Sequence, residues 1–308
     1  MSARILIIFP GALGDLICLA PTIAAIARRH PNADPELMAR GELAELAVGR
    51  FGIARAHSID RREVAMLFRE SQYGPKDQEG AAARGFFGVF ERIYCFFSTD
   101  DALFRRALAT ASAPGKATFH PFRPQAEGHV AAGYLADVIG DANLEAVAIN
   151  LLPRDLEGAS RAISGLAEAQ KFIAIFPGSG SPAKNWPIEK FSALADRLNE
   201  ESTTVFILGP AEDSLENVLR AAGHITIKHQ PLGTVAAIAR RASAFVGNDS
   251  GVSHLAAATG TPGVVLFGLS DPVRWRPLGR VTILHRNPID SIEVPEILEA
   301  VLGRAVRA

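Results

Sequence analysis

Short runs of apolar residues recur along the chain, each ended by turn-forming residues, and they predict buried β-strands. Two of these runs, 4–9 (RILIIF) and 171–176 (KFIAIF), share the tetrapeptide Ile-Phe-Pro-Gly where they end. A glycine-containing loop follows each run, and then a stretch whose apolar residues have helical spacing, 16–29 after the first and 188–198 after the second. The repeated strand–loop–helix unit indicates two similar α/β halves.

The second half keeps this alternation of short strands and helices. Strands are predicted at 203–208, 244–247 and 263–267, and helices at 214–222, 252–259 and 295–306. Such alternation predicts a parallel sheet, because parallel neighbours are joined by helical crossovers. Parallel sheets bind ligands at the carboxyl ends of their strands, and the polar loops of this chain lie at those ends.

The first half is less regular after its first helix. Two stretches, 73–88 with several glycines and 112–130 rich in Pro, His and Arg, are predicted to be loops that face a ligand or a partner. We expect the link between the halves within 150–170. This gives domains at 1–158 and 159–308, with a C-terminal helix that could pack back on the first domain.

Composition is typical of two globular domains and excludes other classes. The 308 residues are 48% hydrophobic and 21% charged, which excludes a disordered chain. The 33 acidic and 32 basic residues balance, so nucleic-acid binding driven by phosphate contacts is not expected. The two cysteines, Cys18 and Cys95, match no metal or redox motif and are expected to be buried thiols. The N-terminal apolar runs are too short to span a bilayer, so a cytoplasmic location is expected.

Several widespread motifs are absent from the sequence. The loop after the first strand is G-x-x-G-D rather than G-x-G-x-x-G, and Gly-Lys-Ser/Thr does not occur, which disfavours dinucleotide dehydrogenases and P-loop nucleotidases. Neither a G-x-S-x-G elbow nor an H-E-x-x-H helix is present. The candidate chemistry therefore lies in other loops.

The first of three polar loops follows the first strand. Gly11 and Gly14 allow the backbone to approach a ligand closely, and Asp15 stands near the start of a helix. Asp15 is therefore either a helix cap or a carboxylate base at a cleft.

The second loop, 178–184, combines glycines and hydroxyls with one lysine. Small residues such as Gly178 leave backbone N–H groups accessible to an anion. Ser179 and Ser181 add hydroxyl donors, and Lys184 adds a positive charge before the next helix. The loop is either a phosphate cradle or a flexible turn with a solvated lysine.

The third loop lies within 247–258 (GNDSGVSHLAAA) and is the most distinctive. The helix that follows is built from small apolar residues, so the N–H groups at its start, near Ser250 and Gly251, can bind a diphosphate. Asp249 either caps this helix or holds sugar hydroxyls. His254, one turn into the helix, is either packed in the core or functional.

Together these segments resemble the family 9 glycosyltransferases, the bacterial heptosyltransferases of lipopolysaccharide synthesis. The resemblance rests on residues 7–15 (IIFPGALGD), 176–187 (FPGSGSPAKNWP), 246–258 (VGNDSGVSHLAAA) and 266–275 (LFGLSDPVRW). It implies a GT-B architecture, in which two Rossmann-like domains face across a cleft, the first for an acceptor and the second for a nucleotide sugar. It also implies an inverting transfer of heptose from ADP-heptose to a glycan or glycolipid.

The resemblance assigns Asp15 the role of general base. It implies that the residues that bind the donor are Ser179, Ser181, Lys184, Glu212, Asp249, Ser250, Gly251 and His254. Among these, Glu212 would hold the ribose and Asp249 the heptose hydroxyls. Because Lys184 and the helix N-terminus would stabilise the leaving ADP, neither a metal nor another cofactor is expected to be obligatory.

Two positions depart from the pattern of the family. Phe9 stands where the family often has a basic residue, and Phe176 where a histidine is common. Both are expected to end strands at the cleft. The missing cation at Phe9 points to an acceptor less anionic than the usual inner core of lipopolysaccharide.

Three alternatives to a heptosyltransferase are considered. The same fold could use another nucleotide sugar for a different glycan, act as a sugar-nucleotide epimerase, or bind sugar nucleotides or glycans without catalysis. Arginines of the first half could also hold an acidic acceptor or steer the protein to the inner membrane, or they could be ordinary solvated side chains. These arginines are Arg28, Arg29, Arg61, Arg62, Arg105, Arg106 and Arg123.

Overall fold

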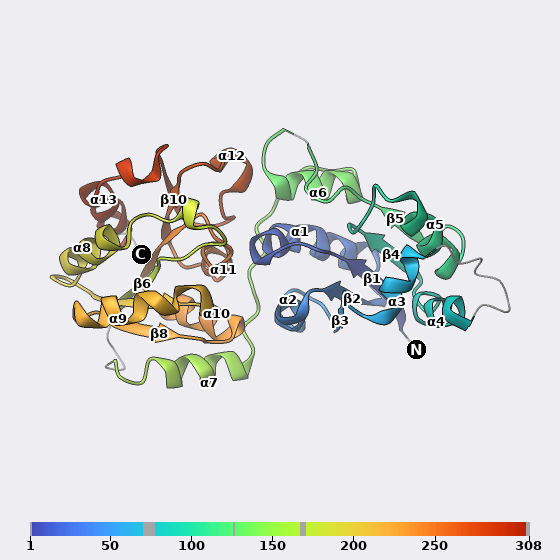
Figure 1. The fold of residues 1–308 in the computed structure, drawn as a ribbon, viewed down its shortest axis with the longest axis horizontal. Coiled ribbons are helices and arrows are strands. Elements are labelled where there is room, and N and C mark those ends of the chain that lie inside the picture. The colour runs from blue at the N-terminus through green and yellow to red at the C-terminus, as the bar shows by residue number, and fades with distance from the viewer. Residues whose placement is uncertain (1, 70–77, 126, 167–170, 306–308) are drawn as a thin grey trace. The chain divides into compact units, whose positions relative to one another are not determined.

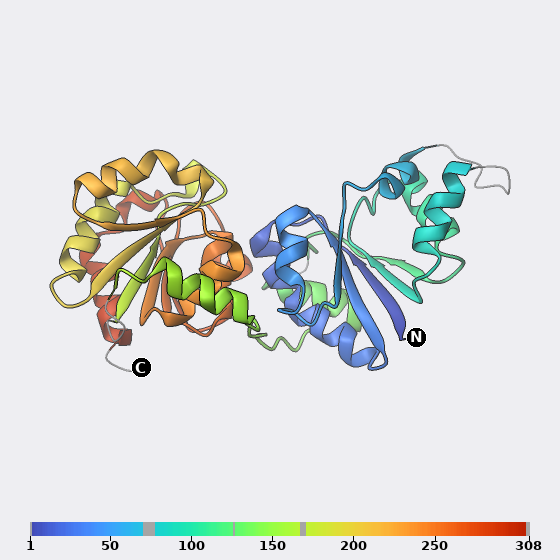
Figure 2. The same ribbon diagram turned by 90° about the horizontal axis from the view of Figure 1, so that it is seen from below.

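The computed structural model describes residues 2–69, 78–125, 127–166 and 171–305. The chain divides into two compact units. Unit 1 comprises Met1–Ala12 and Leu19–Glu145, and unit 2 comprises Leu13–Cys18 and Ala146–Ala308. Each unit holds one parallel sheet with helices on both faces (Figure 1, Figure 2). The predicted α/β class with two similar halves is therefore confirmed.

Unit 1 contains a five-stranded parallel sheet in the order β3-β2-β1-β4-β5. Its strands are β1 (Ala3–Ile8), β2 (Ala33–Ala39), β3 (Arg55–Ser58), β4 (Arg92–Cys95) and β5 (Ala117–Phe119). The helical segments of this half are α1 (Leu13–Arg29), α2 (Gly41–Ala47), α3 (Arg62–Ala65), η1 (Met66–Phe68), α4 (Gln78–Phe87), α5 (Ala102–Ala111) and α6 (Val130–Ile139). The apolar run that predicted the first strand lies at the centre of the sheet, because helices cover both of its faces.

Helix α4 corrects the prediction of a loop over 73–88. Residues 78–87 are helical, because three consecutive alanines favour a helix and because Ala83 and Phe87 are buried in the core against the sheet. Residues 73–77 lie outside the described part of the chain. The loop predicted at 112–130 is interrupted by β5, which pairs with β4 at the edge of the sheet.

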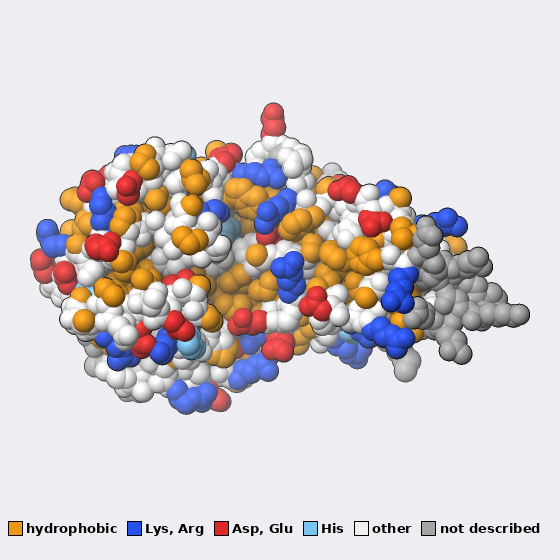
Figure 3. All heavy atoms as spheres, viewed as in Figure 1, with side chains coloured by type: hydrophobic (Ala, Val, Ile, Leu, Met, Phe, Trp, Pro, Cys, Tyr) orange, Lys and Arg blue, Asp and Glu red, His pale blue; other side chains and the backbone are white. Residues whose placement is uncertain are grey.

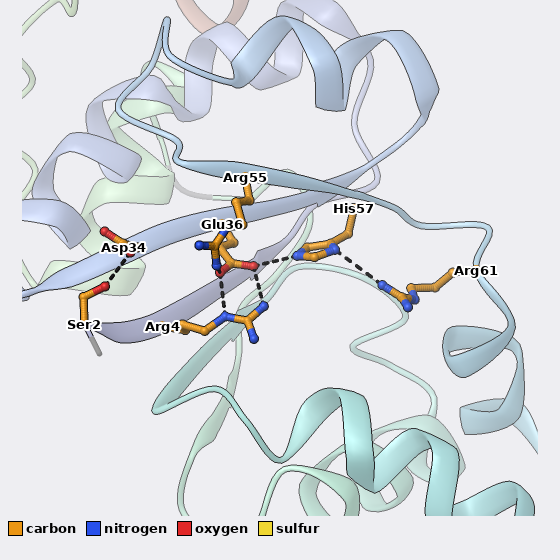
Figure 4. Close-up of polar contacts among 7 residues, drawn as sticks. All are labelled: Ser2, Arg4, Asp34, Glu36, Arg55, His57 and Arg61. Carbon is orange, nitrogen blue, oxygen red and sulfur yellow. Dashed lines mark hydrogen bonds and ion pairs between the residues drawn. The ribbon is translucent and has the colours of Figure 1, made fainter.

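A fully buried carboxylate, Glu36, lies at the middle of β2 (Figure 4). Arg4 on β1 donates two hydrogen bonds to it, from Nε at 2.7 Å and from Nη2 at 2.9 Å. The Nε2 atom of His57 lies 2.6 Å from Oε2, and Arg55 is 3.3 Å from Oε1. Burial favours a higher pKa for Glu36, but the hydrogen bonds and charges of Arg4 and His57 outweigh it and lower the pKa below its ordinary value.

This buried carboxylate should make the stability of the protein depend on acid pH. Because the pKa of Glu36 is lower in the folded chain, its contribution is complete above the unfolded value of 4.5 and is lost as the pH falls through the folded value. We therefore expect the free energy of unfolding to fall less steeply below pH 4.5 for Glu36→Gln than for the wild type. Chemical unfolding at a series of pH values measures this, and parallel profiles would contradict it.

Unit 2 contains a six-stranded parallel sheet in the order β11-β10-β9-β6-β7-β8. Its strands are β6 (Phe172–Phe176), β7 (Thr203–Leu208), β8 (Ile225–Lys228), β9 (Ala244–Asn248), β10 (Gly263–Phe267) and β11 (Val281–His285). The four predicted strands are confirmed. The two that were not predicted, β8 and β11, are the edge strands, whose partly exposed side chains leave no continuous apolar run.

The remaining helical segments belong to this second sheet. They are α7 (Pro153–Ala162), η2 (Pro182–Lys184), α8 (Ile188–Leu198), η3 (Pro210–Glu212), α9 (Asp213–Ala221), α10 (Leu232–Arg241), α11 (Gly251–Ala258), α12 (Pro272–Trp275), η4 (Ile289–Ser291) and α13 (Val294–Ala305). The predictions for α8, α9, α11 and α13 are confirmed. A return of the C-terminal helix to the first half was considered possible from the sequence, but Ile297 and Val301 of α13 lie in the core of unit 2 with residues of α8.

Two further expectations concern cysteines and membranes. Cys18 and Cys95 are buried free thiols, as predicted, and burial raises the pKa of Cys95 to about 12. Within the described ranges, no helix combines the length and the apolar character that a bilayer crossing requires.

Candidate functional site

Two loops of unit 2 leave the sheet side by side. One, residues 177–187, follows β6, and the other, residues 249–250, follows β9 and leads into α11. The two strands are parallel neighbours, with Phe176 opposite Gly247 at their carboxyl ends. The strand order reverses between β6 and β9, and open parallel sheets bind their ligands at this point of reversal.

An ion pair joins these two loops. Lys184 Nζ, at the end of η2, lies 2.7 Å from Asp249 Oδ2. The Asp249 side chain is only 8% exposed, whereas the Lys184 side chain is 37% exposed. The structure thus brings together two of the predicted site residues, with an enclosed carboxylate behind an ammonium that an anion in solution can reach.

The hydroxyls of the loop after β6 organise the loop itself. Ser179 Oγ donates a hydrogen bond to the Ser181 carbonyl at 2.7 Å and accepts one from the Ser181 N–H at 3.2 Å. The Lys184 N–H then donates to the same Ser181 carbonyl at 2.9 Å. This folded turn is a defined structure rather than an open loop. Direct binding of a phosphate by the two serines stays a prediction.

The start of α11 is capped by Ser250 and not by its neighbour. Ser250 Oγ accepts a hydrogen bond from the Ser253 N–H at 3.4 Å and lies 3.2 Å from Ser253 Oγ. The capping interpretation of Asp249 is therefore wrong, since this carboxylate turns to the neighbouring loop instead. The helix dipole still directs positive potential at the space in front of the cap.

The first turn of α1 belongs to unit 2 together with α11. A Cβ atom on Gly14 would lie 3.3 Å from the His254 ring, and one on Gly251 would lie 3.1 Å from the Gly14 nitrogen, so glycine permits this close packing. His254 is 4% exposed and is a packed core residue. Asp15 is 4% exposed and lies inside the first turn of α1.

Glu212 brings a third loop to the same edge of the sheet. It ends η3, which follows β7, and its Oε2 accepts a hydrogen bond from the Gly209 N–H at 2.9 Å. A Cβ atom on Gly178 would overlap the Glu212 carboxylate, so the glycine makes room for it. Glu212 therefore lies beside the loop after β6, where the predicted ribose contact would need it.

Asn248, the last residue of β9, was not among the predicted site residues. Its side chain is fully buried. Its Nδ2 donates to the Pro177 carbonyl at 2.7 Å, and its Oδ1 accepts from the Trp186 N–H at 3.0 Å. The only signal in the sequence is an amide beside Asp249, which does not reveal which distant loop it would hold.

Phe9 directly follows β1 and Phe176 is the last residue of β6, and neither side chain lines an open surface. Their exposed fractions are 0% and 1%. Phe9 packs edge-on against Phe96, Phe122 and Tyr134, with ring centroids 5.7–5.8 Å apart. Both side chains are closed into the core, and a place for these two positions at a cleft stays a prediction.

Several arginines considered for an acidic acceptor have structural partners. Arg29 donates to carbonyls at the end of α6, Arg61 pairs with Glu63 and stacks on Phe86 at 3.6 Å, and Arg105 lies 5.0 Å from the centroid of an aromatic ring. Within the described residues, no three His, Cys, Asp or Glu side chains are grouped to hold a metal ion.

A family model and curated relatives of known type each match part of the chain. The family model described as "Glycosyltransferase family 9 (heptosyltransferase)" matches residues 143–294. Lipopolysaccharide heptosyltransferase 3 of Escherichia coli is 32% identical over 121 residues, which are 35% of this chain and 34% of that protein. The chain thus aligns with about a third of the length of this curated relative.

Solved structures share the fold over the whole chain. The glycosyl transferase family 9 protein from Veillonella parvula DSM 2008 superposes with a TM-score of 0.83, at 18% identity, over 99% of this chain and 98% of that one. The E. coli ADP-heptose lps heptosyltransferase II gives a TM-score of 0.77, at 19% identity, over 99% of both chains. The GT-B fold of two parallel-sheet α/β domains is confirmed. By this family match, residues 143–294 belong to glycosyltransferase family 9, and the whole chain shares the fold of solved structures described as members of that family.

Proposed function

We propose that this protein is an inverting glycosyltransferase that moves a heptose from ADP-heptose to a lipopolysaccharide-core or related glycan acceptor. The observation that carries the proposal is the Lys184–Asp249 pair in front of the capped N-terminus of α11. A cation and a helix N-terminus suit a diphosphate, and an enclosed carboxylate suits sugar hydroxyls. The named relatives, which include an ADP-heptose-dependent enzyme, motivate the choice of this donor.

Donor binding would exchange partners within the ion pair. The diphosphate competes with Asp249 for Lys184, whose side chain is the more exposed of the two. Asp249 then accepts hydrogen bonds from the sugar hydroxyls, so that the enclosed carboxylate is never left without a partner. Glu212, beside the same loop, binds the ribose, and Ser179, Ser181, Ser250, Gly251 and His254 shape the phosphate end of the site.

The chemistry is a displacement at the anomeric carbon. The acceptor hydroxyl attacks from the face opposite ADP, the C–O bond to ADP breaks, and Asp15 takes the proton of the hydroxyl. A carboxylate suffices as base, because the hydroxyl becomes acidic as it bonds to an oxocarbenium-like carbon. Lys184 and the start of α11 stabilise the charge that develops on ADP, so turnover should persist when divalent metals are chelated.

Calorimetric titration with ADP-heptose, in parallel with UDP- and GDP-sugars, tests the donor. Selective binding of ADP-heptose is expected. Preference for another nucleotide sugar would leave the proposed donor site in place but contradict the assignment of heptose as the transferred sugar. Donor turnover with and without acceptor separates the remaining alternatives. A transferase consumes the donor only when the acceptor is present, and an epimerase converts the donor without it. A binding protein leaves the donor unchanged in both cases.

Replacing Lys184 by Ala should weaken ADP-heptose binding by about ten- to hundredfold. The loss corresponds to one charge-assisted hydrogen bond of about 1.5–3 kcal/mol. Lys190→Ala is the matched control, because the contacts of Lys190 are with Asp290, Ile292 and Glu293, outside the proposed donor-binding residues, so its loss should leave the dissociation constant unchanged. Equal affinities of the Lys184→Ala variant and the wild type would remove Lys184 from the donor site.

The acceptor and the location belong to the same proposal. We place the protein in the cytoplasm, with peripheral contact to the inner membrane where a lipid-linked acceptor is reached. On the face seen in Figure 3, acidic and basic side chains are interspersed over the described residues. This mixture, and the structural partners of Arg29, Arg61 and Arg105, support an acceptor recognised more by shape than by charge.

A further inference from the structure

We propose that Asn248 is the positioning residue that holds the loop 177–187 in its donor-binding shape; this inference rests on the proposed function. One side-chain amide contacts both ends of the loop. Nδ2 donates to the Pro177 carbonyl at 2.7 Å, where the loop begins, and Oδ1 accepts from the Trp186 N–H at 3.0 Å, where it ends. The segment that carries Ser179, Ser181 and Lys184 is thereby closed into a ring.

Burial makes this contact exclusive. The Asn248 side chain is 0% exposed, so water cannot replace the loop as its partner. A loop that moved away would leave a buried donor and a buried acceptor unsatisfied, which is costly. The position of the loop and the satisfaction of the amide are therefore coupled.

Both sides of the contact are rigid. Trp186 is 1% exposed, and its indole N–H donates to the Ile292 carbonyl at 3.0 Å, so the end of the loop is anchored in the core. Asn248 is part of β9, and its own carbonyl accepts a hydrogen bond from Ser253 of α11 at 2.7 Å. Asn248 thus links the loop, the strand and the helix that together build the donor site.

The same segment positions the cation. The residue next to Asn248 is Asp249, which binds Lys184 at 2.7 Å. At the end of this strand, Asn248 therefore holds the backbone of the loop, and its neighbour Asp249 separately holds the lysine of the loop. Donor binding removes Asp249 as a partner of the lysine, but it does not disturb the two backbone contacts of Asn248. Asn248 would keep the loop in place throughout the exchange.

The consequence for binding follows from populations. The observed dissociation constant is the intrinsic one divided by the fraction of molecules that have the loop in place. If the loop of Asn248→Ala is in place about a tenth of the time, ADP should bind about tenfold more weakly. The Michaelis constant for the acceptor should not change.

The experiment compares the wild type, Asn248→Ala and the control Asn199→Ala at a temperature where all three are folded. Asn199 also uses its side chain to hold backbone in unit 2, accepting from the Thr204 N–H at 2.8 Å, but it lies at the end of α8. Hydrogen exchange of the amides in 178–186 should accelerate in Asn248→Ala alone. ADP affinity, measured by calorimetry, should fall in Asn248→Ala alone.

A double-mutant cycle with Lys184→Ala separates positioning from general destabilisation. If Asn248 acts through the loop that carries the lysine, its substitution should weaken ADP binding much less in the Lys184→Ala background than in the wild type. Additive losses, or unchanged exchange in 178–186, would overturn the inference. If the wild type binds no ADP, the proposed function fails, and the exchange comparison still decides whether Asn248 holds the loop.

Discussion

Replacing Asp15 by Asn should lower kcat by about 100- to 10,000-fold and leave the affinity for ADP-heptose nearly unchanged. The amide has the size and shape of the carboxylate but cannot accept the proton of the acceptor hydroxyl. The loss should therefore fall on the transfer step rather than on donor binding. Asp15 lies in the first turn of α1, whose first residues group with α11 in unit 2, so its backbone is held by regular structure.

Initial rates with saturating donor and acceptor, together with calorimetry, measure the two effects separately. The matched control is Asp101→Asn, because Asp101 caps α5 through the Phe104 N–H and has no proposed part in transfer. Its kcat should stay at the wild-type value. A kcat for Asp15→Asn within a few-fold of the wild type would show that another group takes the proton.

Replacing Arg4 by Met should lower the free energy of unfolding by about 3 kcal/mol, the low end of the range for breaking a buried ion pair. Arg4 donates two hydrogen bonds, of 2.7 and 2.9 Å, to the enclosed carboxylate of Glu36. His57 and Arg55 still contact Glu36 in the variant, which keeps the loss from being larger. Methionine retains an apolar stem close to Phe90, over which the guanidinium lies at 4.7 Å.

Chemical unfolding of the variant and of Arg197→Met provides the comparison. Arg197 pairs with Glu200 at 3.3 Å, but these side chains are 60% and 67% exposed, so the control should lose less than about 1 kcal/mol. Equal losses in the two variants would mean that enclosure of Glu36 does not determine the strength of its contacts. Activity of the Arg4→Met variant at low temperature should be normal, because the cluster lies outside the proposed donor site.

The central strand β1 of the first sheet and the four inner strands of the second sheet could be predicted because their signal is local. Strands such as β6, β9 and β10 are buried on both faces, so their residues are apolar without interruption. The edge strands β8 and β11 escaped prediction, since a half-exposed strand has no such run. Helix α4 was mistaken for a loop because glycines outweighed an alanine run whose burial depends on the sheet beneath it.

The candidate site shows the same division. Lys184 and Asp249 were each identified from their loops, but their contact depends on β6 and β9 being neighbours, and strand order is a property of the whole sheet. Asn248 was missed for this reason, since an amide next to an acid has no meaning until the loop that it binds is in place. Glu36 was missed because its partners come from two other strands, β1 and β3.

The pattern of residues was therefore sufficient for the α/β class, the repeated strand–loop–helix units, the family and the loops that carry polar side chains. These features arise from periodicity and from short motifs, which act over a few residues. The capping of α11 by Ser250, the enclosure of Phe9 and Phe176, and the contact between Lys184 and Asp249 followed from packing. Burial and pairing join residues that are distant in the chain, and they arise only when the sheets and helices have assembled.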